Sequence, residues 1–240
     1  MVKVDINKSE PILSKLKINL LDLFFPARCV SCGQLGNLFC NDCKADILTI
    51  SSQTCPTCNK ISPKGKFCSR CRPKTALSGI ASACYFREGT IKEAIHSFKY
   101  ENVHSLSINL SRLLIDLLGR EKISFDVVCF VPITKKREGW RGYNQAEILA
   151  QAVADHFKKP LIPVLKKVKE TKTQVGLPKK KREQNLRGAF RIKTGKLQIE
   201  GKRILLVDDV VTTGTTLNEC GRVLKSADVR EIWAVTVAKE

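Results

Sequence analysis

Acidic residues, aromatic residues and long apolar runs are all scarce in this 240-residue sequence. Asp and Glu number 23 against 42 Lys and Arg, so the formal net charge is +19 and we expect phosphates, nucleic acid or another anionic partner. Aromatic residues make up only 6%, which argues against an extended platform for stacking bases. The longest apolar stretches have the length of a strand, which predicts no membrane span. No signal peptide is visible around Asp5 and Glu10, so a cytoplasmic location is expected.

Several catalytic motifs are also missing from the sequence. A loop of the form G-x-x-x-x-G-K-[ST] is absent, which removes the main support for an NTPase. His96, His104 and His156 lie on expected helices without a partner at ligand spacing, so we assign them no chemistry. No Ser–His–Asp or Cys–His nucleophile is present, and the catalytic residues therefore stay unassigned.

The stretch 204–216 is the most informative part of the sequence. Its first four residues form an apolar, β-branched run typical of a strand buried on both faces of a parallel sheet. This predicted strand ends in two adjacent carboxylates, which a turn rich in Thr and Gly follows. A helix is expected next, because four residues recur at helical spacing to form an inward face: Leu217, Cys220, Gly221 and Leu224.

This order of elements is suited to binding a sugar phosphate. Backbone N–H groups at the start of a helix, together with Thr hydroxyls, form a cradle for a phosphate dianion. The carboxylates lie one ribose away and can accept hydrogen bonds from vicinal hydroxyls. The alternative is an ordinary turn, with the acids solvated or bound to Mg²⁺ as in phosphatase-like proteins. The candidate residues are Asp208, Asp209, Thr212, Thr213, Gly214, Thr215 and Thr216.

Eight of the cysteines occur as four CxxC pairs within 29–71, in two similar halves that each close with Phe-Cys-x-x-Cys. Two CxxC pairs satisfy one tetrahedral Zn²⁺, so two structural sites are predicted, with disulfides as the alternative that a reducing compartment disfavours. Two such sites would lower the net charge to about +15. The single cysteines Cys84, Cys129 and Cys220 are expected in the core. The predicted ligands are Cys29, Cys32, Cys40 and Cys43 for one site, and Cys55, Cys58, Cys68 and Cys71 for the other.

Three parts of the chain follow from these patterns. Residues 1–26 contain an amphipathic helix, which either packs on the zinc module or docks a partner or membrane surface. Residues 27–78 form the double zinc ribbon, and residues 73–79 read as a linker. Residues 79–240 are expected to form an α/β domain with a mainly parallel sheet, because strands at 81–86, 126–131 and 204–207 are separated by helices, including 89–100 and 106–118.

Two basic segments of the α/β part are candidates for binding anions. The loop between Pro132 and Tyr143 follows a predicted strand, where ligands of open α/β sheets bind, although a solvated turn is the alternative. Trp140 and Tyr143 could stack bases there, and Asn144 could cap the next helix. The stretch 166–191 is typical of a mobile active-site loop, and its run 179–182 is either a solvated face or a track for nucleic acid. The basic residues of the first segment are Lys135, Lys136, Arg137 and Arg141.

Two resemblances add to this interpretation. The stretch 204–216 resembles the signature of class I phosphoribosyltransferases, which bind 5-phosphoribosyl-1-diphosphate (PRPP). The segments 141–146, 173–177 and 185–190, together with Arg182, resemble the ComF family of competence proteins. Tyr143 stands where Phe is usual in that family, and its ring is kept.

The resemblance implies a double zinc ribbon followed by a phosphoribosyltransferase-type domain similar to amidophosphoribosyltransferases. PRPP would bind with Mg²⁺, its diphosphate beside Lys135, Lys136, Arg137 and Arg141. A flexible loop would close over it, with Thr173, Gln174, Arg182 and Asn185 in matching positions. The family further implies a role in natural transformation, receiving single-stranded DNA in the cytoplasm beside a helicase.

Two functions therefore remain open from the sequence. The first is a competence protein that binds PRPP or a related ligand and handles single-stranded DNA. The second is an active phosphoribosyltransferase that moves the phosphoribosyl group to an amine or nucleobase and releases diphosphate. No acceptor pocket or base can be identified between Ser78 and Asn102, and the sequence does not indicate the oligomeric state.

Overall fold

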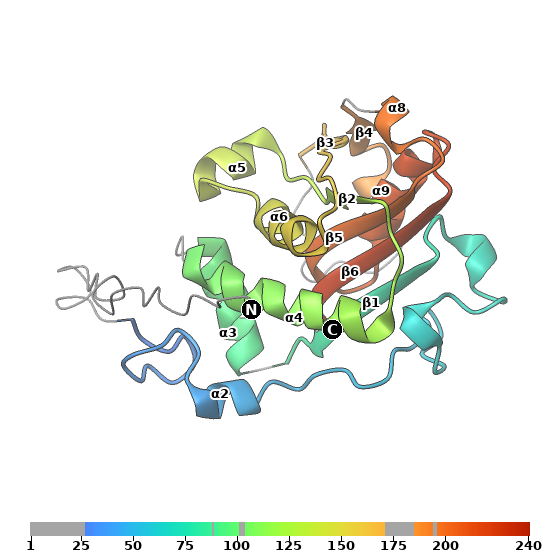
Figure 1. The fold of residues 1–240 in the computed structure, drawn as a ribbon. Helices are drawn as coiled ribbons and strands as arrows, with labels where there is room; N and C mark the ends of the chain where they lie inside the picture. Colours follow the sequence, from blue (N-terminus) through green and yellow to red (C-terminus); the bar gives the residue numbers. More distant parts are fainter. Residues whose placement is uncertain (1–26, 88, 101–103, 171–184, 194–195) are drawn as a thin grey trace, which may run out of the picture.

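A four-stranded parallel sheet with the order β1-β6-β5-β2 lies at the centre of the molecule (Figure 1). The computed structural model describes residues 27–87, 89–100, 104–170, 185–193 and 196–240. The predicted N-terminal helix within 1–26 lies outside these described residues. The sheet confirms the mainly parallel α/β class that the sequence predicts. Its strands are β1 (Gly79–Tyr85), β6 (Glu231–Lys239), β5 (Arg203–Val211) and β2 (Val127–Phe130).

Helices cover both faces of this sheet and leave its central strands almost fully buried. Residues 204–207 of β5 are completely shielded from solvent, as expected for a strand covered on both sides. Within the expected helix 89–100, Ile91, Ile95 and Phe98 recur at helical spacing, and all three are buried. One face packs against α3 (Thr90–Tyr100), α4 (His104–Glu121) and α6 (Gln145–Phe157), and the other against α9 (Thr215–Lys225).

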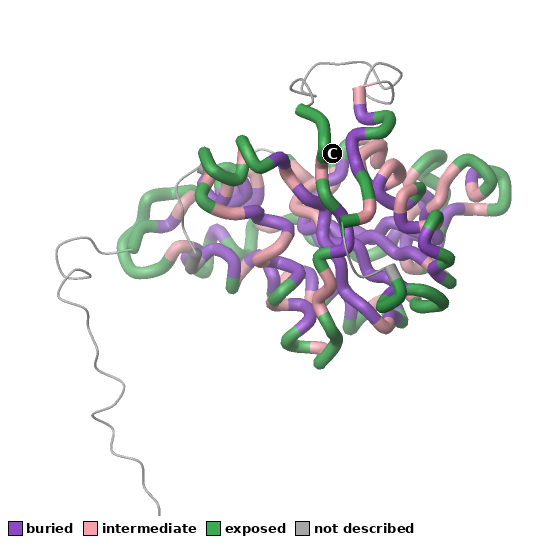
Figure 2. Tube along the Cα trace, turned by 90° about the horizontal axis from the view of Figure 1, so that it is seen from above, coloured by how far each residue is buried: buried purple, intermediate pink, exposed green. Residues whose placement is uncertain are grey.

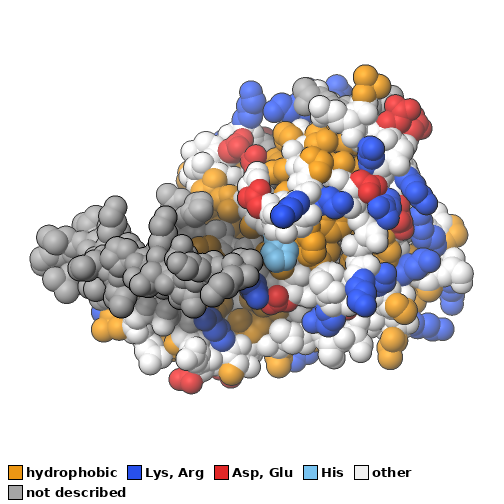
Figure 3. Space-filling view, in the orientation of Figure 1, with side chains coloured by type: hydrophobic (Ala, Val, Ile, Leu, Met, Phe, Trp, Pro, Cys, Tyr) orange, Lys and Arg blue, Asp and Glu red, His pale blue; other side chains and the backbone are white. Residues whose placement is uncertain are grey.

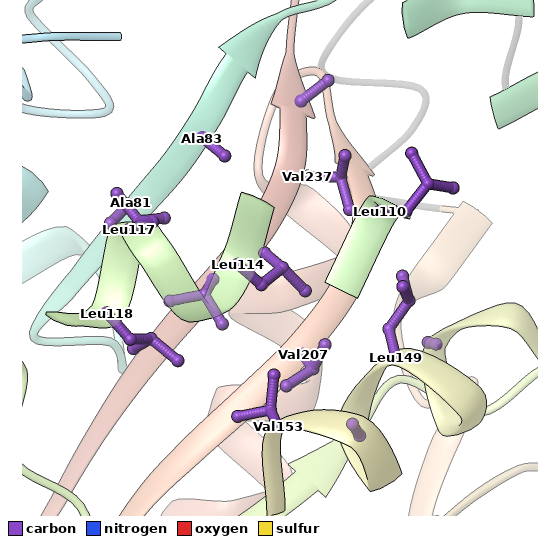
Figure 4. Packing of buried hydrophobic residues seen from close by; sticks show 14 of the residues in the cluster. Ala81, Ala83, Leu110, Leu114, Leu117, Leu118, Leu149, Val153, Val207 and Val237 are labelled. Carbon is purple, nitrogen blue, oxygen red and sulfur yellow. The ribbon is translucent and has the colours of Figure 1, made fainter. Parts of the chain in front are cut away.

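Leu and Val side chains of α4 and α6 interdigitate with small and β-branched residues of the sheet (Figure 4). Ala81 and Ala83 of β1 leave room for the leucines of α4, while Val207 of β5 meets α6. Figure 2 shows the chain turned by 90° from the view of Figure 1. In this view the buried residues follow the central strands and the exposed residues form the outer turns. Among the described residues, no helix is long and apolar enough to cross a membrane.

The basic segment after β2 is a short helix, α5 (Lys135–Arg141), and not the loop that the sequence predicts. The Thr134 side chain accepts a hydrogen bond from the Arg137 N–H and caps its first turn. Gly142 ends the helix in the left-handed conformation, with φ of +80°. Asn144 caps α6 as expected, because its side chain accepts from the Ala146 N–H.

The ends of the predicted mobile loop are also ordered into secondary structure. β3 (Leu165–Lys167) and β4 (Phe190–Ile192) pair antiparallel, and α8 (Lys196–Ile199) follows. Leu165 and Phe190 are buried, so the core fixes these two short strands. The centre of the loop, 171–184, contains Thr173, Gln174 and Arg182 and lies outside the described residues.

The cysteine-rich segment runs along the free edge of β1 (Figure 1). Antiparallel bridges join Thr49 to Cys84 and Lys66 to Gly79, at the two ends of the strand. This pairing satisfies backbone groups that an edge strand would otherwise leave exposed. The elements of the segment are α2 (Asn41–Ala45), η2 (Pro63–Gly65) and η3 (Arg72–Lys74).

The predicted linker 73–79 is packed against the α/β part rather than free. Leu77 is fully buried against Gly221 of α9. The Asn218 side-chain oxygen accepts hydrogen bonds from the Thr75 hydroxyl and the Ala76 N–H, both at 2.9 Å. The Pro, Ser and Gly content of this segment predicted a linker, because a single buried leucine produces no periodic pattern of apolar residues.

Candidate functional site

The candidate site lies where β5 leaves the sheet and α9 begins. β5 continues through the acidic pair to Val211, three residues beyond Asp208, which corrects the expected end of the strand. The extension occurs because Val210 and Val211 are β-branched and pair with the end of β6. A turn then reaches Gly214, whose φ of +71° is one that glycine tolerates best, and α9 starts at the next residue.

A cavity of about 500 Å³ opens at this turn, within the size range of small-ligand sites. The sequence-predicted residues of the acidic pair and the Thr-rich turn all contribute to its walls. The hydroxyls of Thr213 and Thr215 are hydrogen-bonded at 2.8 Å. Other walls come from Phe86 at the end of β1, Lys99 of α3 and Glu240. The predicted residues in the lining are Asp208, Asp209, Thr212, Thr213, Gly214, Thr215 and Thr216.

Lys99 is a member of this site that sequence reasoning missed. Its Nζ lies 2.8 Å from Oδ2 of Asp209, and both side chains are largely shielded from solvent. Asp209 also accepts a hydrogen bond from the Val210 N–H, and Asp208 accepts one from the Asp209 N–H. A usable signal existed, since Lys99 lies four residues after the inward-facing Ile95 and so on the same side of the predicted helix.

The two carboxyl groups have shifted pKa values of opposite sign. Burial, reinforced by the negative charge of Asp209, raises the pKa of Asp208 well above its usual range. Burial would also raise the pKa of Asp209, but the ammonium of Lys99 outweighs it and the pKa is lowered. Burial opposes the charge on Lys99, yet the attraction of Asp209 prevails and raises the pKa of Lys99. The cavity therefore holds a compensated pair beside a second, weaker acid.

The predicted diphosphate residues of α5 are only partly brought to this site. Arg141 lies close enough to Lys99 for its charge to oppose that of the lysine, and it donates to the Gln145 side-chain oxygen at 3.2 Å. Lys135 and Lys136 are exposed, and no residue of α5 is among the described residues that line the cavity. Tyr143 donates to the Phe98 carbonyl, so its hydroxyl joins the turn before α6 to α3.

The eight paired cysteines form two separate clusters, in the grouping that the sequence predicts. Within each cluster all four sulfurs lie within 4.8 Å of one another, and all eight are free thiols. Sulfur pairs are 3.6 Å apart between Cys32 and Cys40 and 3.7 Å between Cys58 and Cys68. A tetrahedron with Zn–S bonds of about 2.3 Å has edges of about 3.8 Å, so each cluster fits one structural Zn²⁺. The clusters are Cys29, Cys32, Cys40 and Cys43, and Cys55, Cys58, Cys68 and Cys71.

The duplication of the cysteine module extends to its backbone. In the first half the Cys29 N–H donates to the Gln34 carbonyl at 2.8 Å, and in the second the Cys55 N–H donates to the Lys60 carbonyl at 2.8 Å. The two halves nevertheless pack differently. Phe39 of the first half joins the core beneath α4, whereas Phe67 of the second joins the core beneath α9. The single cysteines, Cys84, Cys129 and Cys220, are buried in the core as expected.

Comparison with known proteins places both parts of the chain. A family model described as "Phosphoribosyl transferase domain" matches residues 144–240, and one described as "Double zinc ribbon domain" matches residues 20–72. Competence protein F of Haemophilus influenzae is 32% identical over 223 residues, which cover 87% of this chain and 95% of that protein. The chain belongs to the competence protein F (ComF) family.

Further relatives of this ComF-family chain carry related names. Competence protein ComFC of Bacillus subtilis is 26% identical over 195 residues, or 77% of each chain. DNA utilization protein YhgH of Escherichia coli K12 is 31% identical over 150 residues, which span 59% of this chain and 64% of that protein. The family assignment confirms the resemblance found in the sequence.

Among solved structures, the glutamine PRPP amidotransferase of B. subtilis, in complex with ADP and GMP, is 25% identical to this ComF-family chain. The match covers 56% of this chain and 26% of that one, with a TM-score of 0.39.

Proposed function

We propose that this chain binds PRPP with Mg²⁺ and acts in the uptake and handling of single-stranded DNA during natural transformation. The observation that carries the proposal is the shared cavity of Asp208, Asp209 and the Thr-rich turn at the start of α9. The match to the phosphoribosyl transferase model and the names of the relatives support it. We place the protein in the cytoplasm, where clusters of four CxxC-type cysteines bind metal more often than they form disulfides.

The geometry suggests a role for each part of the cavity in holding PRPP. The hydroxyls of Thr213 and Thr215 and the first N–H groups of α9 would bind the 5′-phosphate. The acidic pair would accept hydrogen bonds from the ribose hydroxyls. Lys99 would keep the site from repelling the anionic ligand, because it compensates one of the two acids. Mg²⁺, which usually binds through substrate phosphates and one or two carboxylates, would neutralise the diphosphate.

The distribution of charge supports single-stranded DNA as the second partner. Lys and Arg side chains are scattered over the described part of the face in Figure 3, and acidic side chains are fewer there. The net charge of +19 would fall only to about +15 with two Zn²⁺ bound. Such an excess exceeds what one diphosphate can use and suits a phosphate backbone. We further propose that a helicase is its protein partner and acts on the same incoming single strand.

Thermal unfolding with and without PRPP and Mg²⁺ tests the ligand assignment. At a hundredfold excess over Kd, binding should stabilise the fold by about 2.7 kcal/mol, or about 5–10 °C. The double change Asp208→Asn with Asp209→Asn should abolish this shift and leave the protein folded. Asp155→Asn, at an exposed position of α6, is the matched control and should keep the shift. No shift in the parent protein under saturating conditions would refute PRPP as the ligand.

A second candidate function is an active phosphoribosyltransferase, and the cations near the cavity favour it. Lys99 lies in the cavity and Arg141 lies close to it, where they could stabilise charge on a leaving diphosphate. The C1–O bond of PRPP would break as an amine or nucleobase nitrogen forms a bond to C1. Diphosphate release from PRPP, measured with and without single-stranded DNA or candidate amines, distinguishes turnover from binding alone.

A further inference from the structure

A second cavity, of about 510 Å³, shares the turn of the candidate site as a common wall. Residues 211–215 line both cavities. The opposite wall of this second cavity comes from the second zinc-ribbon half, where Thr57 lies between two cysteines of the metal cluster and Asn59 follows. The zinc module therefore forms part of a ligand-sized space that reaches the phosphate-binding turn.

The charges that line this cavity favour an anionic ligand. Lys239, near the end of β6, is only partly exposed, and its Nζ donates to the Thr54 hydroxyl at 3.1 Å. Burial lowers the pKa of Lys239, because its ammonium has lost water that would solvate the charge. An anionic ligand beside this ammonium would compensate for the lost water and would be bound favourably. Lys74 supplies a second cation and Glu240 the one carboxylate among the described lining residues.

The remaining walls combine hydrogen-bonding groups with an apolar surface. Thr57 and Asn59 are exposed and offer a hydroxyl and an amide. Phe67 and Ile80, each 6% exposed, form the apolar part. A ligand with an anionic group, polar edges and an apolar ring face has the chemistry of a nucleotide. We propose that this second cavity binds one nucleotide, as a unit of a single-stranded nucleic acid or as a free nucleoside monophosphate.

This inference builds on the proposed function, because it gives DNA handling a place next to the PRPP site. Thr213 and Thr215 line both cavities, and their hydroxyls share one hydrogen bond. A ligand that recruits one hydroxyl changes the donor or acceptor that the other presents to the neighbouring cavity. Occupancy of one cavity therefore alters affinity in the other, and the two effects are equal in both directions.

The duplicated zinc module supplies a matched control for the test. Thr57→Val removes the hydroxyl of the second CxxC pair without changing the side-chain shape, and Thr57→Ser restores it. Ser31→Ala makes the corresponding change in the first pair, which does not line this cavity. Lys239→Met removes the half-buried cation of β6, and Lys60→Met removes an exposed cation of the zinc module.

The probe is a short fluorescent oligo-deoxythymidine, bound at low salt to the full zinc-loaded chain. Thr57→Val and Lys239→Met should each weaken binding roughly two- to tenfold, the range for one lost hydrogen bond. The Thr57→Ser, Ser31→Ala and Lys60→Met proteins should bind as the parent does. Equal binding by all five variants, or equal losses in the controls, would overturn the inference.

Two further measurements are needed. The first distinguishes a free nucleotide from a nucleotide within a strand, and the second distinguishes failure of the nucleotide proposal from failure of the PRPP proposal. If deoxythymidine monophosphate competes with the oligonucleotide in the parent and less well in Thr57→Val, the cavity accepts a free nucleotide. If the monophosphate does not compete while Thr57→Val still loses oligonucleotide affinity, the nucleotide belongs to a strand. The thermal shift with PRPP is measured without oligonucleotide, so its absence would refute the proposed ligand of the first cavity without altering the oligonucleotide result.

Discussion

Replacing Lys99 by Met should destabilise the protein in a manner that depends on pH. The change removes the ammonium 2.8 Å from Asp209 and keeps most of the apolar stem. Breaking a fully buried ion pair costs about 3–5 kcal/mol, whereas an exposed pair contributes about 1 kcal/mol or less. The side chains of Lys99 and Asp209 are 24% and 15% exposed, between these limits. We therefore expect a loss of about 2 kcal/mol at neutral pH.

The pH window follows from the directions of the two pKa shifts. The lowered pKa of Asp209 means that its contribution is present above its unfolded pKa of about 3.9 and is lost as pH falls through the folded value. The raised pKa of Lys99 means that its contribution is present below about pH 10.4 and is lost as pH rises through the folded value. The pair is therefore fully stabilising between about pH 4 and pH 10.

Thermal unfolding followed by circular dichroism provides the measurement. A loss of about 2 kcal/mol corresponds to about 4–8 °C for a chain of this length. The loss should shrink below about pH 4, because Asp209 of the parent then becomes protonated and the parent loses the ion pair as well. Arg112→Met, which breaks an exposed pair with Asp116, is the control and should cost less than about 1 kcal/mol. A loss no larger than this control, or one that does not vary with pH, would refute the compensation argument.

Three other predictions concern the metal, the packing and the DNA contacts. Mass spectrometry under native conditions should find two Zn²⁺ per chain, and chelation should lower the melting temperature. Gly79→Ala should destabilise by about 1–3 kcal/mol, because a Cβ would lie 2.2 Å from the Trp233 ring, whereas Gly119→Ala meets open space and should not. Replacing Lys179, Lys180 and Lys181 by Ala should weaken binding to all single-stranded sequences and flatten the salt slope by about 2.

Hydrophobic periodicity predicted most of the fold because the core is built from regular elements. The four inward positions expected on α9, from Leu217 to Leu224, are all buried, and the apolar run of β5 is fully shielded. Periodicity failed for α5, whose seven residues have no apolar face. That helix is defined by its ends, since Thr134 caps it and Gly142 terminates it. These two residue types in sequence could have indicated it.

The candidate site was predictable only where its residues are contiguous. Asp208 and the Thr-rich turn follow one another in the sequence, so their chemistry can be read directly. Lys99 meets Asp209 because α3 packs across the end of β5. Helical spacing places Lys99 on the inward side of its helix, but it does not identify Asp209 as the partner. The wall that Thr57 adds to the second cavity depends likewise on how the zinc module docks along β1. Pairings of this kind follow from packing between distant segments.

The hydrogen bonds between the zinc module and β1 have a consequence for synthesis of the chain. β6 is the neighbour of β1 in the sheet, and the paired residues Ser82 of β1 and Thr236 of β6 are 154 residues apart in the sequence. β6 therefore leaves the ribosome on the order of ten to thirty seconds after β1. The cysteine-rich segment precedes β1 and bonds to both ends of that strand. Its Ile50 N–H donates to the Ala83 carbonyl, and its Phe67 N–H donates to the Ser78 carbonyl just before the strand begins. Metal loading of the nascent module would thus cover one edge of β1 before β6 is translated and pairs with the other edge.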